Sequence, residues 1–460
     1  MELSTKENIG NIAKRDETGV HQISGIDGYN KPLEECYKRL CKPSVVLWGD
    51  EHNSIMDNSI HKRNAISKEN GIYINPDFVN EYIVDLVMGG ACAWAINRKG
   101  ELFIWGTVLG DDFILRADSK IMFKNVMRLE MGTRISSIAS DVTYSIAIDM
   151  ERNVWIIIRP DRPYIIESDL INNEHADSTP IQVVCGRFFS AILTRSGEVY
   201  FIWPFDAYAM GAFRKQYEGS STRFEIEGNS ISCKTWKLKY DLYKLPQIGD
   251  LPELDQRGRI PGSNSPPKII KIAAMYNRLF GITDDGHILS ITGVESRAEI
   301  EDKHWTYFKE NGSPKKGWET NVAARGLRYS VVRSTADPRA VPDLEDPICR
   351  LHFTSSNSGY NHVIHLSSCG KVITDGYNNG HALGRGDLKE YEWHKSGEVD
   401  FGKGKFCISV TAGRSQSGAL VADLNPIPDL NPVTDLTQSS KPNFATRLMK
   451  AVYDYRHYFF

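Results

Sequence analysis

The sequence has no long hydrophobic run, no C-x-x-C pair and almost no excess of charge of either sign. No apolar stretch approaches the roughly 20 residues that a membrane-spanning helix needs, and the polar start MELSTKENIGNIAKRDE lacks the apolar core of a secretory signal. Eight cysteines are scattered over 460 residues, a pattern typical of free thiols in a reducing compartment. We therefore expect a protein of the cytoplasm, the nucleus or both.

Features of enzymes and of nucleic-acid-binding proteins are also missing. A formal net charge of −3, with 25% charged residues, provides no basic field for nucleic acid or an anionic membrane. The motifs G-x-x-x-x-G-K-[ST], G-x-S-x-G and H-E-x-x-H do not occur, so phosphate-loop, hydrolase and metalloprotease chemistry have no support. We expect a protein that is not an enzyme, needs no cofactor, and binds neither nucleic acid nor membrane.

The potential metal ligands have unsuitable spacing. In a strand, His362 and His365 would point to opposite faces, and Cys369 would sit in the following turn. Cys36 and Cys41 have no second pair, which a structural zinc site requires. The segment ITDDGH has two carboxylates at a turn but lacks the other ligands of a calcium loop. We expect no metal site.

An internal repeat is what the sequence does have. Two glycines eleven residues apart, followed by an apolar run, occur in IVDLVMGGACAWAINRKGELFIWG (83–106) and VVCGRFFSAILTRSGEVYFIW (183–203). The pattern returns in SNSGYNHVIHLSSCGKVITDG, and IAAMYNRLFGITDDGHILSITG keeps its second glycine, Gly286, with the apolar Ile282 four residues before it. It also returns in IASDVTYSIAIDMERNVWIII, with Asp141 and Arg152 in place of the glycines. A pattern that recurs along the chain in this way is typical of stacked supersecondary units.

Each unit is predicted to be a β-hairpin. Val, Ile, Tyr, Phe and Trp flank turns such as NRKG, TRSG and TDDG, in which glycine takes a positive φ without steric cost. Apolar residues on both faces indicate strands covered on both sides, as in sheets stacked around a ring. The residues expected to carry the repeat are Trp48, Gly49, Gly100, Trp105, Gly106, Gly197, Gly286, Gly370, Gly384 and Asp387.

Two half-units mark the ends of the repeat region. ISVTAGRSQSGALV (408–421) has only the first half of a unit, and SVVLWG (44–49) has only the second. Pairing of these segments would close a ring whose last blade takes strands from both ends. With one degenerate copy counted near 321–336, the sequence predicts an all-β, seven-bladed propeller over 44–423, with short helical termini. Six blades are the alternative.

Four segments lie outside the repeats. Residues 1–43 precede them, 204–268 are an insert, 424–442 are a polar, proline-containing linker, and 443–460 form a short amphipathic helix. The insert carries aromatic residues among charges, so it is a candidate partner-binding loop. The alternative is that it lies over a blade and that TWKLKYDLYKL adds a strand. The aromatic candidates are Phe205, Tyr208, Phe213 and Tyr217.

The stretch NNGHALGRGD (378–387) resembles the signature that follows the last strand of a blade in the regulator-of-chromosome-condensation repeat family. Its glycines allow tight turns, Leu383 can anchor the loop, and Asp387 can accept backbone N–H bonds. The resemblance covers about 44–423 and implies the propeller fold of that family. Some members are guanine-nucleotide exchange factors for small GTPases, so the resemblance leaves that activity open as an alternative.

Several blocks are similar, in the same order, to fungal F-box proteins whose carboxyl-terminal part is this propeller. They are PLEECYKRLCKPSVVLWGDEHN, SAILTRSGEVYFIWPF, ISCKTWKLKYDLYKLPQIGDLPEL and IIKIAAMYNRLFGITDDGHIL. This resemblance implies a substrate receptor of a cullin–RING (SCF-type) ubiquitin ligase. In such a complex the F-box holds the Skp adaptor, which links to the cullin, and the propeller holds an unknown target protein.

The amino-terminal segment departs from the F-box pattern, because residues 1–30 have no Leu-Pro start. Leu33, Tyr37 and Leu40 share one helical face and match only the last F-box helix. These three residues are the candidates for adaptor docking, and the alternative is that their face packs on the propeller. An interaction scaffold is a third function compatible with the sequence.

Overall fold

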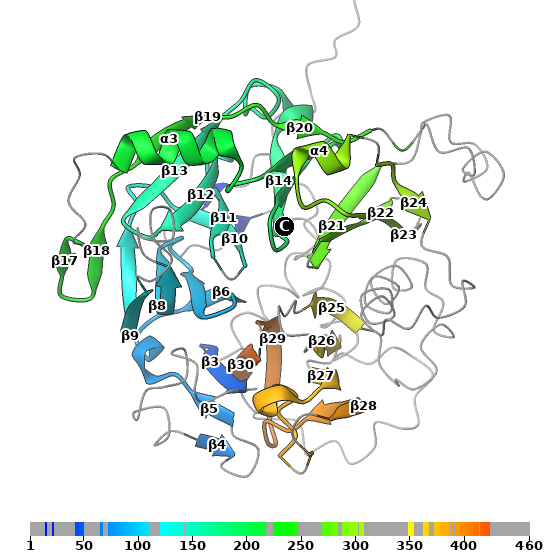
Figure 1. Ribbon diagram of the computed structural model, residues 1–460. Coiled ribbons are helices and arrows are strands. Elements are labelled where there is room, and N and C mark those ends of the chain that lie inside the picture. The colour runs from blue at the N-terminus through cyan, green and yellow to red at the C-terminus, as the bar shows by residue number, and fades with distance from the viewer. Residues whose placement is uncertain are drawn as a thin grey trace, which may run out of the picture.

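The computed structural model places six sheets side by side around a common centre (Figure 1). It describes residues 14–15, 21–22, 42–49, 65–67, 72–109, 120–217 without 142, 224–248 without 247, 268–307 without 276, 284–287 and 302, 348–353, 362–367, and 372–423 without 387, 390–391 and 414. Within these ranges no helix is long and apolar enough to span a bilayer. The described chain is mainly β and has the propeller arrangement that the sequence predicted.

Five of the sheets share one plan, in which neighbouring strands pair antiparallel from the centre of the ring outward. The first sheet contains β6 (Ile83–Met88), β7 (Cys92–Asn97), β8 (Leu102–Leu109) and β9 (Lys120–Glu130). The second contains β10 (Ile135–Ser140), β11 (Ser145–Asp149), β12 (Val154–Arg159) and β13 (Arg162–Glu167). The third contains β14 (Pro180–Cys185), β15 (Ser190–Thr194), β16 (Val199–Ile202) and β20 (Tyr243–Lys244). The fourth contains β21 (Ile269–Met275), β22 (Arg278–Thr283), β23 (Ile288–Thr292) and β24 (Thr306–Tyr307). The fifth contains β25 (Ile348–Phe353), β26 (His362–Ser367), β27 (Val372–Tyr377) and β28 (Trp393–Val399).

The sixth sheet combines strands from both ends of the repeat region. It contains β29 (Lys405–Ala412), β30 (Gln416–Asp423), β3 (Ser44–Gly49), β5 (Ile72–Ile74) and β4 (Ala65–Ser67). β3 pairs antiparallel with β30, so the two half-units seen in the sequence do lie in one sheet. The degenerate copy near 321–336 lies outside the described residues, and seven blades therefore stay a prediction.

Short helices and one small sheet complete the description. The 3₁₀ turns are η2 (Pro76–Phe78), η3 (Ala176–Ser178) and η7 (Asn379–His381). The α-helices are α3 (Ala207–Tyr217) and α4 (Arg297–Ile300). A separate two-stranded sheet pairs β1 (Lys14–Arg15) with β2 (His21–Gln22). The two predicted terminal helices, over 33–40 and 443–460, lie outside the described residues.

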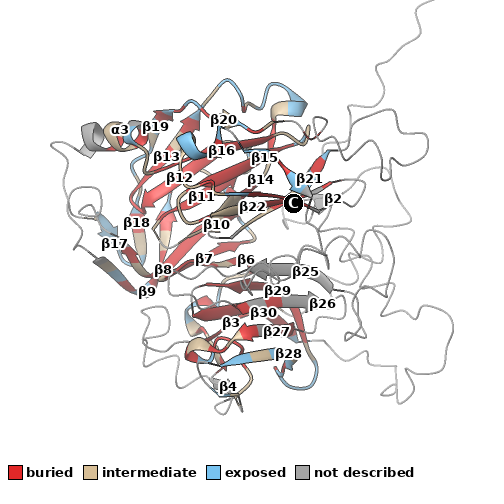
Figure 2. Ribbon diagram, turned by 45° about the vertical axis from the view of Figure 1, so that its right-hand side comes forward, coloured by how far each residue is buried: buried red, intermediate tan, exposed pale blue. Residues whose placement is uncertain are grey.

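Apolar clusters fill the spaces between neighbouring sheets (Figure 2). Trp94 of the first sheet packs in one cluster with Trp155 of the second, and Ile156 of the second packs in another with Ile192 of the third. Further clusters join the third sheet to the fourth, the fifth to the sixth, and the sixth to the first. Both faces of these strands are therefore buried, which explains why their apolar residues do not alternate with polar ones.

One irregularity recurs in the innermost strand of all six sheets. The pairing of the first strand with the second skips one residue, which is the signature of a β-bulge. A polar residue follows each bulge. These residues are Asp85, Ser137, Gln182, Lys271, Arg350 and Ser409. In the third sheet the Gln182 amide donates to the Ile272 carbonyl oxygen and accepts from its N–H, both at 2.9 Å, and so links two sheets.

The turn between the second and third strands explains the second glycine of the repeat. Gly100 and Gly197 have φ of +82° and +90°, a conformation that costs glycine little. A Cβ on Gly197 would also lie 3.0 Å from the backbone nitrogen of Ile269 in the next sheet. Arg152 holds the same turn position with φ of +69°. Two other predicted turn glycines lie outside the described residues: Gly286 and Gly370.

The signature-like loop after β27 packs on the sixth sheet. Leu383 is fully buried, and Trp48 Nε1 of β3 donates to the Ala382 carbonyl oxygen at 2.8 Å. A Cβ on Gly384, whose φ is +63°, would lie 2.7 Å from Trp48 Nε1. Glycine at this position is therefore needed both for the backbone conformation and for the close contact. Asp387 lies outside the described residues.

The insert forms a band across the outside of three sheets (Figure 1). β18 (Ser230–Ser232) pairs parallel with β9 of the first sheet and carries β17 (Ile226–Glu227) at the edge. β19 (Trp236–Lys239) pairs parallel with β13 of the second sheet, and β20 becomes the outer strand of the third. The prediction that TWKLKYDLYKL adds a strand is confirmed.

Candidate partner-binding face

One face of the ring is built by the turns between the first and second strands, and we call it the inner-turn face. Its described turns are 89–91, 141–144, 186–189, 276–277 and 413–415, with 142, 276 and 414 excepted. Neighbouring turns are in contact in the first three sheets: Gly90 N–H reaches the Asp141 carbonyl oxygen at 3.4 Å, and the Tyr144 hydroxyl donates to the Gly186 carbonyl oxygen at 3.3 Å. These contacts connect the inner-turn face across the first three sheets.

The close approach of neighbouring turns explains why each of these repeats has its first glycine. A Cβ on Gly89 would lie 2.7 Å from the Asp141 carbonyl oxygen, and one on Gly413 would lie 2.4 Å from the Gly89 carbonyl oxygen. The backbones of neighbouring turns therefore meet where these glycines lie. Because no side chain fits between them, the inner-turn face is rigid close to the centre of the ring.

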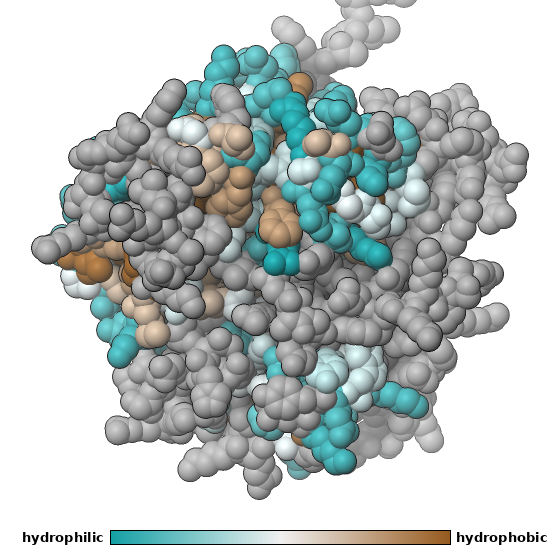
Figure 3. Space-filling view, in the orientation of Figure 1, coloured by the Kyte–Doolittle hydropathy of each residue, from teal (hydrophilic) through white to brown (hydrophobic). Residues whose placement is uncertain are grey.

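A group of aromatic side chains from the inner turns and from the start of the insert lies on the inner-turn face. Phe205 packs edge-on against Tyr144, with ring centres 5.5 Å apart, and Tyr144 contacts the turn that carries Phe188. The Arg187 guanidinium lies 4.7 Å from the centre of the Phe188 ring. Arg187, Phe188 and Phe205 are all partly exposed. Figure 3 shows apolar side chains between α3 and β14, bordered by hydrophilic ones.

A hydrogen-bonded carboxylate fixes the position of Phe205. The neighbouring Asp206 caps helix α3, because its Oδ1 accepts from the Ala209 N–H at 2.7 Å. Its Oδ2 accepts from the Tyr240 hydroxyl at 2.6 Å, which ties α3 to the part of the insert that follows β19. Burial, with help from the bond to Asp206, raises the pKa of Tyr240 well above its usual range. The hydroxyl therefore stays protonated and keeps this bond at all physiological pH values.

The four aromatic candidates of the insert have different surroundings. Phe213 is fully buried under α3, where its ring centre lies 4.7 Å from that of Tyr164. Its ring packs against the core of the second sheet. We therefore correct the assignment of Phe213 from a candidate for partner binding to a core residue. Phe205 is on the inner-turn face. The side chains of Tyr208 and Tyr217 lie outside the described residues, as do all three adaptor-docking candidates, Leu33, Tyr37 and Leu40.

The described thiols are poor nucleophiles. Burial raises the pKa of the Cys92 thiol to about 11 and that of the Cys233 thiol to about 12. Burial likewise raises the pKa of Cys185 to about 12, and this thiol lies 3.5 Å from the Ser190 hydroxyl. Because the thiolate is the nucleophilic form, these environments do not suit covalent catalysis.

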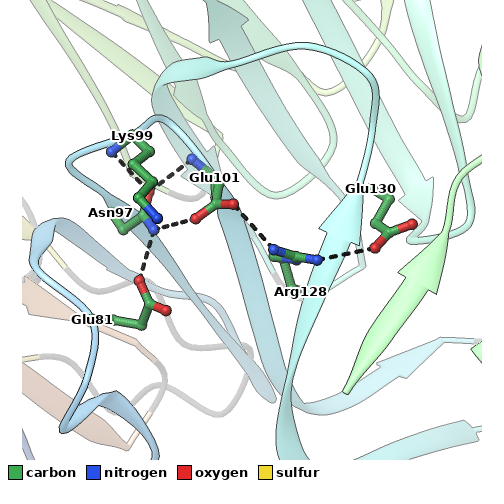
Figure 4. A network of polar contacts seen from close by, with 6 residues as sticks. All are labelled: Glu81, Asn97, Lys99, Glu101, Arg128 and Glu130. Atoms are coloured by element: carbon green, nitrogen blue, oxygen red, sulfur yellow. Dashed lines mark hydrogen bonds and ion pairs between the residues drawn. The ribbon is translucent and has the colours of Figure 1, made fainter. Parts of the chain in front are cut away.

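A second polar group lies on the opposite rim, at the turn between β7 and β8 (Figure 4). The Asn97 side-chain amide donates to Glu81 at 2.8 Å and to Glu101 at 2.6 Å, while Arg128 bridges Glu101 and Glu130. The Asn97 Oδ1 accepts the N–H groups of the turn, at Lys99 and Glu101. Asp149 caps the equivalent turn of the second sheet in the same way, so we assign this group a structural role.

The histidine that sequence spacing singled out also has a structural partner. His362 is buried, and its Nε2 lies 2.8 Å from the Ser417 hydroxyl of β30. Ser417 in turn donates to the Ala382 carbonyl oxygen at 2.8 Å, which joins the fifth and sixth sheets. Across the part of the chain that is described, no group of three His, Cys, Asp or Glu residues is placed to hold a metal ion.

Sequence reasoning missed Arg187, Phe188 and Tyr144. The stretch GRFF (186–189) begins with the first glycine of a repeat and aligns with GGAC (89–92) of the first copy. Two adjacent aromatic residues in a turn where the first copy has only small ones were a usable signal. Phe189 is fully buried, while Phe188 is partly exposed, and the sequence alone does not distinguish the two.

No protein-family model matches the chain, and no curated protein matches its sequence. The structure is similar to that of Prp20p from Saccharomyces cerevisiae, solved with a study of its binding to Gsp1p and histones. The identity is 13% and the TM-score 0.45, over 85% of this chain and 95% of that chain. Yeast RCC1 (Prp20) bound to Kap60 has 12% identity and a TM-score of 0.44, over 92% and 97%. Human WBSCR16 has 14% identity and a TM-score of 0.43, over 83% and 99%. Because identities and scores are low, the propeller arrangement rests on the strand pairing of the chain itself.

Proposed function

We propose that this chain is a non-enzymatic propeller that binds another protein through the inner-turn face. The observation that carries the proposal is the Phe188 ring with the Arg187 guanidinium 4.7 Å from its centre, both partly exposed on a rigid surface. Aromatic residues and arginine are enriched at the centres of protein–protein interfaces. Little conformational entropy is lost on binding where the backbone is already held by neighbouring turns.

Within that function we propose the substrate-recognition component of an SCF-type ubiquitin ligase. The support is the ordered similarity of four sequence blocks to fungal F-box receptors, together with the helical face that the sequence predicts at Leu33, Tyr37 and Leu40, before β3. In this arrangement the amino-terminal face holds the Skp adaptor and cullin, and the inner-turn face holds the target for degradation. The site of action is the cytoplasm or the nucleus.

Affinity purification tests the adaptor part of this proposal. The full chain and a variant without residues 1–43 are purified from cell extract, and bound proteins are identified by mass spectrometry. We expect the Skp adaptor and cullin with the full chain only. The triple variant Leu33→Asp, Tyr37→Asp, Leu40→Asp should lose them, while Glu35→Ala with Lys38→Ala, off that face, should keep them.

Two outcomes would redirect the proposal. Absence of the adaptor from every sample would rule out the ligase role for this chain. A small GTPase recovered instead, with nucleotide release accelerated by the purified chain, would identify a guanine-nucleotide exchange factor. Recovery of other proteins without adaptor or GTPase would leave an interaction scaffold.

A further inference from the structure

Three arginines follow one another along the rim opposite the inner-turn face, and we call them the arginine arc: Arg134, Arg152 and Arg195. Arg134 directly precedes β10, and its carbonyl oxygen accepts from the Met150 N–H at 2.7 Å in the turn between β11 and β12. Arg152 stands in that same turn, and Arg195 stands in the equivalent turn between β15 and β16. The arc therefore extends from the start of the second sheet to the third.

The Cβ of Arg152 is directed at the third sheet. Gly100 holds the same turn position in the first sheet, and a Cβ there would lie 2.8 Å from the Cβ of Arg134, the residue before the next sheet. The residue before the third sheet is Thr179, whose carbonyl oxygen accepts from the Arg195 N–H at 3.0 Å. Arg152 and Arg195 are therefore neighbours. Burial and then the charge of Arg195 lower the pKa of Arg152, as expected for adjacent guanidinium groups.

Within the part of the chain that is described, none of the three guanidinium groups forms a hydrogen bond or an ion pair. Asp149 attracts Arg152 from inside the same turn, but this acid is fully buried. Its Oδ1 accepts from the Glu151 and Asn153 N–H groups, at 2.9 and 2.8 Å, and its Oδ2 accepts from Trp155 Nε1 at 2.9 Å. The carboxylate of Asp149 is thus occupied by the turn, and the arc presents positive charge.

The backbone of Arg152 adds a second observation. Its φ is +69°, in the left-handed region that favours glycine, and Gly100 and Gly197 hold this position in the neighbouring sheets. Strained positions of this kind are frequent where ligands bind, because the surrounding fold compensates for their cost. Placing a half-buried guanidinium next to that of Arg195 is a further cost. The electrostatic part of this cost disappears when an anionic group binds beside both side chains.

We propose that the arginine arc is a docking site for an acidic segment of a partner protein. Guanidinium groups bind carboxylates through paired, charge-assisted hydrogen bonds, and complementary charge across an interface orients the partner. Three arginines on successive turns suit a chain with several separated carboxylates. In an extended segment, acidic residues at alternate positions lie on one face, about 7 Å apart. Such a segment places a carboxylate on each of two neighbouring arginines.

Nucleic acid fits this rim less well. The exposed acids Glu151, Glu174 and Asp177 stand on the same rim, where the Asn173 amide donates to the Glu151 carbonyl oxygen. Nucleic acid has a negative charge on every phosphate and would meet these carboxylates as well. A protein segment can place neutral or basic residues opposite them. The net charge of −3 for the whole chain favours the same choice.

Fluorescence anisotropy with a labelled synthetic peptide tests the proposal on the full chain. The probe is a twelve-residue peptide in which glutamate alternates with serine, and the same peptide with glutamine in place of glutamate should bind more weakly. Arg152→Gly combined with Arg195→Gln should weaken binding of the glutamate peptide about twentyfold, from about fivefold for each ion pair lost. Lys237→Gln combined with Lys389→Gln removes the same charge from exposed lysines outside the arc and should leave binding unchanged.

Arg152→Gly alone separates lost binding from lost folding. It relieves the turn, so it should unfold no more easily than the natural chain, yet it should bind the glutamate peptide about fivefold more weakly. Failure of the natural chain to bind this peptide, equal binding by Arg152→Gly, or equal losses in the two double variants would overturn the proposal. Tighter binding of single-stranded DNA or of a phosphoserine peptide would also overturn it, by assigning the arc to phosphate groups.

Discussion

At the scale of single residues, the repeat is a set of backbone conformations that most side chains disfavour. In the first three sheets, the turn after the second strand has a residue with positive φ, and glycine supplies it at Gly100 and Gly197. Arg152 meets the same need with a Cβ, at a cost of roughly 1 to 2 kcal/mol. It is also half-buried, and burial together with the nearby Arg195 lowers its pKa.

Replacing this arginine should therefore stabilise the fold. We expect Arg152→Gly to raise the free energy of unfolding by about 0.5 to 1 kcal/mol, because the relief of strain exceeds the extra entropy of glycine in the unfolded chain. Arg152→Ala keeps the Cβ and should gain nothing from the turn. Urea denaturation of both variants measures the difference, and equal stabilities would show that the turn is not strained.

Replacing a glycine should destabilise the fold where other atoms lie close to its Cα. Gly384→Ala places a Cβ against Trp48 Nε1 in a left-handed conformation, so it should cost about 3 kcal/mol. Gly404 has φ of +75° and no atom within 4 Å of its Cβ position. Gly404→Ala therefore measures the cost of the left-handed conformation alone, without a steric contact. Thermal unfolding should show the larger loss for Gly384→Ala, and equal losses would argue against the contact with Trp48.

The buried Cys92 thiol of the first sheet should make the free energy of unfolding depend on pH in a defined direction. Folding raises the pKa of Cys92 to about 11, while the unfolded chain ionises near its ordinary value of about 8.5. The unfolded state thus binds fewer protons than the native state between about pH 8.5 and pH 11. The contribution of Cys92 to the free energy of unfolding is therefore fully present below about pH 8.5 and is lost as the pH rises toward 11. At pH 8 we expect iodoacetamide to alkylate Cys92 in the native chain on the order of a hundredfold more slowly than in urea.

At the scale of elements, the buried ring of Phe213 attaches helix α3 to the second sheet. Phe213 is fully buried and packs on Tyr164, so Phe213→Ala should lower the free energy of unfolding of this part by about 3 kcal/mol. Limited proteolysis should then cut the insert near α3, whereas Ala207→Ser on the exposed side leaves it resistant. An unchanged cleavage pattern in Phe213→Ala would restore this residue as a candidate for partner contact.

The elements also show how far sequence reasoning extends. The hairpins, the half-units at 44–49 and 408–421, and the added strand in TWKLKYDLYKL follow from local patterns of apolar residues and turns, which are visible along the chain. The partner strands of β18 and β19 and their parallel direction could not be predicted, because each pairing joins segments about 70 to 100 residues apart and leaves no periodic trace. The inner-turn face was missed for the same reason, because Phe205, Tyr144 and Phe188 meet only after three segments pack together.

At the scale of the whole molecule, the ring depends on pairing between the two ends of the repeat region. β3 supplies the third strand of the sixth sheet, and Trp48 bonds the loop of the fifth. Deleting residues 1–49 should therefore remove cooperative unfolding, while deleting 1–41 keeps every described strand of this sheet and should unfold like the full chain. Circular dichroism during heating compares them, and equal transitions would contradict the role of β3 in holding the ring.

The claim that the inner-turn face binds a partner protein is tested most directly by one comparison. The natural chain, Phe188→Asp and Val79→Asp are purified from the same cells, and the bound proteins are quantified by mass spectrometry. Val79 is 73% exposed in the loop after η2, away from the inner-turn face, and so controls for a new surface charge. We predict that a defined protein is lost from Phe188→Asp and kept by Val79→Asp, and identical sets of bound proteins would contradict the account.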